Sequence, residues 1–145
     1  ILKGNGSGGF SSAAAGTDYL APAAIGTTVQ AYDAQLFSNI PQNSQSAAYT
    51  LVASDAQKHI YHPSADTTAR IWTIPANSSV AYPVGTAITF INDTSAGVIT
   101  IAITSDTLVL AGAGTTGSRT LAASGIATAI KKTSTSWMIS GTGLT

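Results

Sequence analysis

The sequence predicts an all-β fold, an antiparallel β-sandwich or barrel-like domain of about eight short strands. From Ala47 to the C-terminus, short runs of β-branched and aromatic residues are separated by clusters of turn-forming residues. Two of these runs, 87–92 and 97–104, are joined by a glycine-containing turn and have the pattern of a β-hairpin. Both runs contain threonine, so the sheet is expected to present hydroxyl groups.

The expected strands follow one another closely along this region. In one of them Ile99, Ile101 and Ile103 share a face, which is the alternation of a half-buried strand. The glycine-rich segment 111–118 is expected to be a loop, and a closing hairpin is expected around a turn at 133–135. The expected strands are 48–53, 57–62, 68–74, 86–91, 97–103, 107–111, 126–132 and 135–140.

Residues 1–46 are expected to form an extended N-terminal attachment arm, and residues 47–145 the β-sandwich domain. The first residues are glycine-rich and are expected to be a flexible tether. The rest of the segment has no sustained period, but it contains spaced apolar side chains that could dock on a neighbouring surface. The expected docking residues are Phe10, Tyr19, Leu20, Ile25, Val29, Tyr32, Leu36 and Phe37.

The composition favours an oligomer or an assembly. Only 8% of the residues are charged, against about 25% in an ordinary domain, and six Lys and Arg balance six Asp with no Glu. A surface so poor in charge suits a protein that is covered by neighbours. The zero net charge gives no footprint for nucleic acid. No apolar stretch approaches the length of a membrane span, so no membrane partner is expected.

No enzymatic site is expected. His59 and His62 are three residues apart in an expected strand, so they point to opposite faces and are not expected to form a zinc site within one chain. A histidine near a symmetry axis could still hold a metal or an anion between subunits. The aspartates are scattered beside turns, and no nucleophile motif accompanies them. The spacing of Gly4, Gly6 and Gly9 matches a dinucleotide fingerprint, but no strand precedes it. We therefore expect no catalytic residue, no metal and no cofactor.

Aromatic residues near cations leave two interpretations open. Tyr61, Trp72 and Tyr82 could be stacking platforms for the sugar rings of a glycan. Alternatively, Trp72 and Trp137 are core packing residues, with Arg70, Lys131 and Lys132 as solvated cations beside them.

Two parts of the sequence carry a resemblance to a known family. The first comprises 16–22 and 25–33 and looks like a connector that recurs in fibre proteins. The second is the later pattern at 55–58, 82–86, 88–90, 97–101 and 137–141. Together they resemble modules of tailed-bacteriophage virion proteins, which occur in tail fibres and in related surface proteins.

The resemblance implies a trimeric, β-rich structural module without enzymatic activity, bound to the virion through one end. The leading expectation is a tail-fibre module attached through its N-terminal arm. The alternative is a capsid decoration protein whose residues 1–46 clamp adjacent capsid subunits, and the third is a glycan-binding module. A depolymerase would need an essential aspartate.

The expected partners are two further copies of the chain, a tail or major capsid protein and a host surface glycan. The expected location is the virion surface, with the host cytoplasm during assembly. The Thr- and Ser-bearing faces are expected to meet these partners.

Overall fold

The computed structural model describes residues 2–4, 7–12 and 39–145, which fall into two units, 1–38 and 39–145. In the first unit, strands β1 (Leu2–Gly4) and β2 (Phe10–Ser12) pair antiparallel. The glycine-rich start that we expected to be a tether therefore contains a two-stranded pair. Of the expected docking residues, Phe10 begins β2, and the other seven, from Tyr19 to Phe37, lie outside the described residues.

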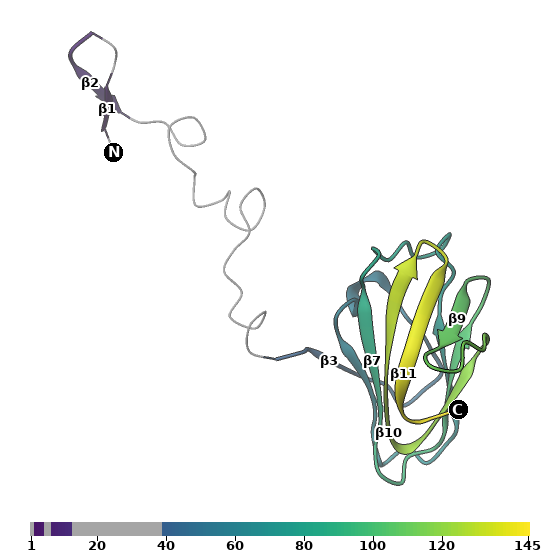
Figure 1. Cartoon of the computed structure of the whole chain (residues 1–145). Coiled ribbons are helices and arrows are strands. Elements are labelled where there is room, and N and C mark those ends of the chain that lie inside the picture. Colours follow the sequence, from purple (N-terminus) through teal and green to yellow (C-terminus); the bar gives the residue numbers. More distant parts are fainter. Residues whose placement is uncertain (1, 5–6, 13–38) are drawn as a thin grey trace. The chain divides into compact units, whose positions relative to one another are not determined.

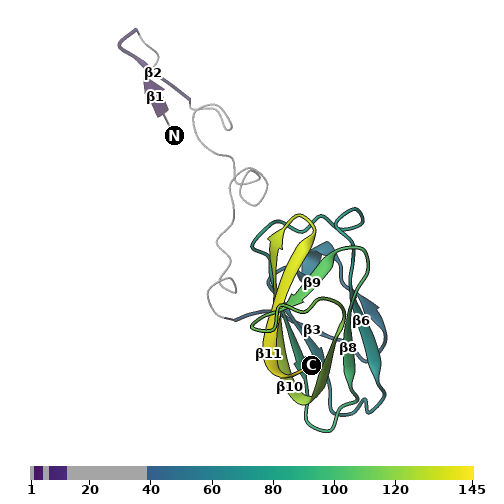
Figure 2. The ribbon, with the colours of Figure 1, turned by 45° about the vertical axis from the view of Figure 1, so that its right-hand side comes forward.

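The second unit is one curled, open sheet of nine strands, so the all-β class is confirmed. Figures 1 and 2 show the sheet closing partly on itself, as half of a barrel does. Its elements are β3 (Gln42–Ser44), β4 (Tyr49–Thr50), the 3-10 turn η3 (Ala53–Asp55), β5 (His59–His62), β6 (Arg70–Ile74), β7 (Ala87–Asn92), β8 (Ile99–Ile103), β9 (Thr107–Leu110), β10 (Arg119–Thr133) and β11 (Ser136–Leu144).

The strand order is β3-β5-β7-β10-β8-β6-β4, with β11 beside β10 and β9 beside β11. Strand β10 pairs antiparallel with β7, β8 and β11, but the other five pairs are parallel. The expectation of an antiparallel sheet is therefore wrong for most of the pairs. The physical reason is that the chain alternates between two halves, β3-β5-β7 and β4-β6-β8. Within each half, neighbouring strands are therefore two places apart in the chain and run in the same direction.

The expected hairpin of 87–92 and 97–104 is also wrong. These runs do form strands, β7 and β8, but β7 belongs to one half of the sheet and β8 to the other. Both pair with β10, which is long enough to cross between the halves: its residues 119–121 face β8, and its residues 125–130 face β7. Strand β10 thus joins the two halves of the sheet.

The core lies between the two halves. The rings of Trp72 on β6 and Phe90 on β7 lie 6.3 Å apart across it. Along β7, buried and half-buried residues alternate, as the pleat of a strand requires. Ile99 and Ile101 are fully buried and Ile103 packs against the core, so the expected face of this strand is confirmed.

Each of the eight expected strands overlaps an observed one, but the observed domain begins earlier than expected, and so does the strand expected at 126–132. Strand β3 lies inside the segment 1–46 that we assigned to the arm, and β10 begins at Arg119. The C-terminus remains in the sheet, since Thr120 and Thr145 exchange two backbone hydrogen bonds of 2.9 Å. Within the described ranges, no helix is long and apolar enough to cross a membrane.

Candidate functional site

Two of the three expected glycan-stacking residues are inaccessible. Trp72 is 0% exposed and its indole N–H donates to the carbonyl of Ala47, while Tyr82 is 4% exposed and its hydroxyl donates to the carbonyl of Val52. Buried rings cannot stack on a sugar, so the packing interpretation is correct for Trp72, as it is for the fully buried Trp137. Tyr61 stays partly exposed.

The two histidines point to opposite faces of β5, as expected, and His62 is the buried one. Its Nε2 lies 2.9 Å from Asp66 Oδ2, and its Nδ1 lies 2.9 Å from Asn92 Oδ1. The amide nitrogen of Asn92 donates to two backbone carbonyls, so its oxygen is the atom that accepts a hydrogen bond from Nδ1. Arg70 also holds Asp66, with Nε and Nη2 at 2.8 and 3.1 Å from the two carboxylate oxygens.

This His62 cluster is a closed structural network. Hydrogen bonds from Arg70 and then from His62 hold the pKa of the Asp66 carboxyl well below its usual range. Each side chain of the cluster forms a hydrogen bond with another member, and His62 is fully buried. The cluster therefore connects β5, β6 and β7 and offers no exposed base.

A second network joins the two open edges of the sheet. Asp55, 1% exposed, accepts hydrogen bonds from Asn43 Nδ2 at 2.9 Å, Tyr49 Oη at 2.7 Å and the backbone N–H of Val52 at 2.9 Å. Burial, together with the hydrogen bond to Asp55, raises the pKa of Tyr49. Because Asn43 is on β3 and Tyr49 on β4, the carboxylate connects the two edge strands.

Sequence reasoning missed a third network, around Lys131. This lysine was expected to be a solvated cation beside Trp137, but it is only 1% exposed. Its Nζ donates to Asn77 Oδ1 at 2.6 Å and lies 5.6 Å from the centre of the Trp137 ring. The signal was present, because Ala127, Ala129 and Lys131 alternate along β10 and therefore share its inward face.

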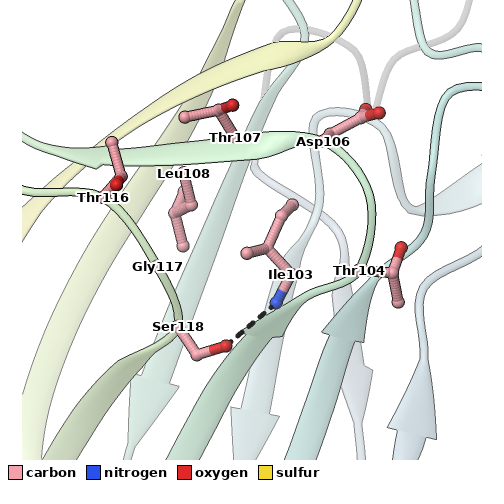
Figure 3. Close-up of a pocket in the computed structure, with 8 residues that line it drawn as sticks. All are labelled: Ile103, Thr104, Asp106, Thr107, Leu108, Thr116, Gly117 and Ser118. Atoms are coloured by element: carbon pink, nitrogen blue, oxygen red, sulfur yellow. Dashed lines mark hydrogen bonds between the residues drawn. The ribbon is translucent and has the colours of Figure 1, made fainter.

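A hollow of about 330 Å³ lies between the end of β8, strand β9 and the loop that precedes β10. Figure 3 shows Ile103 and Leu108 facing the same space and the Ser118 hydroxyl accepting a hydrogen bond from the Ile103 N–H. Its lining has one carboxylate, no histidine and no aromatic ring, so it contains neither an acid–base pair nor a stacking platform. The lining residues are Ile103, Thr104, Asp106, Thr107, Leu108, Thr116, Gly117 and Ser118.

The outward surface of β7, β10 and β11 is a candidate for an interaction with another protein. Three rows of residues face each other across these strands, and none is charged. Large apolar side chains are exposed within it: Ile126 at 47%, Ile130 at 48% and Met138 at 38%. We call this surface the outer face; its residues are Ala87, Thr89, Ile91, Ile126, Thr128, Ile130, Met138, Ser140 and Thr142.

The charged residues around the outer face lie at the ends of strands. Lys58 precedes β5, Asp93 follows β7 and Lys132 is the penultimate residue of β10. In the middle of the face, the hydroxyl oxygens of Thr89 and Thr128 lie 2.9 Å apart. The face therefore combines apolar side chains with small hydroxyl groups.

In the part of the chain that the structure describes, no group of three or more His, Cys, Asp or Glu could hold a metal ion. Comparison with protein-family models, with curated proteins and with solved structures finds no match.

Proposed function

We propose that this chain is a non-enzymatic structural protein of a tailed-bacteriophage virion, a trimeric tail-fibre module attached through its N-terminal segment. The observation that supports this proposal best is the outer face, a sheet surface without a single charge. The resemblance of segments 16–22 and 25–33 to a fibre connector is the ground for the virion assignment.

An uncharged face is suited to protein contact because burying it leaves no unpaired charge. Ile126, Ile130 and Met138 supply apolar area, whose burial contributes about 25 cal/mol per Å². Threonine and serine hydroxyls can donate or accept, so they find partners on a similar surface. Such a composition resembles the core of a subunit interface, from which charged residues are depleted.

The occupants that we propose are two further copies of the chain, whose outer faces meet around a threefold axis, because three uncharged faces approach one another without like-charge repulsion. Sedimentation of the purified protein should show a trimer. Replacing Ile130 by lysine places charges in the contact and should shift the protein toward monomers. Ile71, 54% exposed on β6 in the other half of the sheet, provides the matched control. The I71K variant should remain trimeric, and a wild-type protein that is monomeric at every concentration would contradict the proposal.

Imaging of intact virions distinguishes the two virion locations. Density for this chain on tail appendages supports the fibre module. Density on the head lattice would instead favour the alternative, a capsid decoration protein. Attachment is tested with a chain that lacks residues 1–38, which should fold but fail to join the particle. Its normal incorporation would refute the role of the N-terminal segment.

A glycan-binding role now depends on Tyr61, since the other two expected platforms are buried. If the β-domain binds a host surface glycan, a glycan array should give hits that the Y61A variant loses. An array without hits would exclude this third function.

A further inference from the structure

Lys131 is a buried cation whose neighbours do not neutralise it. The side chain is 1% exposed. The two side-chain ion pairs in residues 39–145 join Asp66 to His62 and to Arg70, so no carboxylate pairs with Lys131. An ammonium group is expensive to bury without a carboxylate partner. Within residues 39–145, its Nζ contacts the side-chain amide oxygen of Asn77 and the face of the Trp137 ring.

The lysine nitrogen lies next to an amide carbon. Nζ is 2.6 Å from Asn77 Oδ1. Since a carbonyl bond is about 1.2 Å long, Cγ of Asn77 lies within about 3.8 Å of Nζ. This is close to the separation of about 3 to 3.5 Å at which bound reactants are poised to react.

The backbones of both residues are hydrogen-bonded, and the lysine is kept away from water. Trp137 is fully buried, and Tyr82 packs edge-on against it with ring centres 5.6 Å apart. The backbone N–H of Asn77 donates to Asp106 Oδ2 at 3.1 Å, and the backbone of Lys131 is bonded on both sides, to Thr86 and Gly85. Exclusion of water removes the hydration shell that would otherwise shield the nucleophile.

From this geometry we infer that Lys131 and Asn77 become joined by an intramolecular isopeptide bond. Nζ first passes one proton to Asn77 Oδ1, to which it donates a hydrogen bond, and its lone pair then attacks Cγ of Asn77 and forms a C–N bond. The proton on Oδ1 is later taken up by the released ammonia. The bond from Cγ to Nδ2 then breaks, and the amide nitrogen leaves as ammonia with a proton from the attacking nitrogen. The net change converts an ammonium group and a primary amide into a secondary amide and an ammonium ion, with no oxidant or cofactor. Asp106 is a positioning residue, because it holds the backbone of Asn77.

The bond would join positions 54 residues apart, the turn before β7 and the inward face of β10. It would also remove the buried charge. A covalent link over such a span restricts the unfolded chain in the way that a disulfide does.

Mass spectrometry of the intact wild-type protein, kept folded at neutral pH, is the decisive test. The mass should be lower than the sequence mass by one ammonia molecule. Digestion with trypsin locates the loss, because an acylated Lys131 is not cleaved. Residues 71–119 should then remain linked to residues 120–132. A mass equal to that of the sequence overturns the inference, as does an ammonia loss that maps elsewhere, for example to Asn5, which precedes a glycine.

Variants separate this reaction from a general effect on folding. K131M and N77A should each retain their full sequence mass. The matched control K132M alters the adjacent, exposed lysine and should still lose ammonia. D106A, which removes the acceptor for the Asn77 backbone N–H, should keep the circular dichroism of the wild type but give a smaller fraction of linked peptide in freshly refolded protein. Equal linked fractions in D106A and wild type would overturn the role of Asp106.

Discussion

At the residue scale, the Asp66 carboxylate predicts how stability depends on pH. Its pKa is lowered in the folded protein, first by Arg70 and then by His62. A carboxyl with a lowered folded pKa stabilises the fold above its unfolded pKa, which is about 3.9, and this contribution is lost as the pH falls. D66N should therefore be less stable than the wild type at neutral pH, and the difference should shrink from about pH 4 downward.

Urea unfolding of the two proteins across this pH range measures the difference directly. Some acid sensitivity should remain in D66N, because the Tyr61 hydroxyl likewise lowers the pKa of Asp93. A difference between D66N and wild type that stays constant down to low pH would contradict the assignment.

Individual residues also show where reasoning from the sequence succeeded and failed. The inward isoleucines Ile99 and Ile101 were predicted, because alternation within one strand is a local property. The burial of Trp72 was left open, since aromatic residues suit both a core and a sugar platform. Tyr82 was expected only as a sugar platform, and its burial was missed. Lys131 was misassigned because its charge was weighed above its position in the alternation.

At the element scale, the bend in β10 predicts an effect of the opposite sign to most substitutions. The strand shifts register between Leu121 and Ile126, and Ser124 within this bulge has a φ of 60°. Left-handed backbone costs a non-glycine residue about 1–2 kcal/mol, whereas glycine adopts it freely. Glycine also costs conformational entropy on folding, which offsets part of this relief. S124G should therefore raise the free energy of unfolding by about 0.5–1 kcal/mol.

The neighbouring substitution A123G is the matched control, because Ala123 does not have a positive φ. This variant should lower the free energy of unfolding by about 0.5–1 kcal/mol. Chemical denaturation compares both variants with the wild type. If S124G and A123G destabilise the protein equally, the bend does not strain Ser124.

The elements that could not be predicted lack a local signal. Strand β3 is Gln42-Asn43-Ser44, without an apolar residue, and its extended form comes from parallel pairing with β5. The parallel pairs were missed for a related reason: alternation identifies a strand but does not reveal its neighbour. A strand that pairs with the next but one in the chain looks in sequence the same as a strand of a hairpin.

At the scale of the whole molecule, charge is placed so that the sheet surfaces remain neutral. Asp55 and Lys131 are buried, while the charged groups around the outer face are at strand ends. This arrangement explains how a chain with 8% charged residues can present a broad uncharged surface. The position of the domain boundary also matters for the sheet, because its first strand, β3, begins at Gln42, close to the boundary at residue 39.

The boundary is tested by two truncations. Removing residues 1–38 leaves the unit 39–145 intact, so the free energy of unfolding of the β-domain should change by less than about 0.5 kcal/mol. Removing residues 1–46, the arm as the sequence defined it, also deletes β3 and with it Asn43, a donor to the buried Asp55. A hydrogen bond to a charged group contributes about 1.5–3 kcal/mol, so the shorter protein should lose at least this amount. N43A in the chain that lacks residues 1–38 isolates the hydrogen bond from the strand. Urea unfolding of these three proteins and of the full chain measures each step. Equal stability of the two truncated proteins would show that the sheet does not need β3.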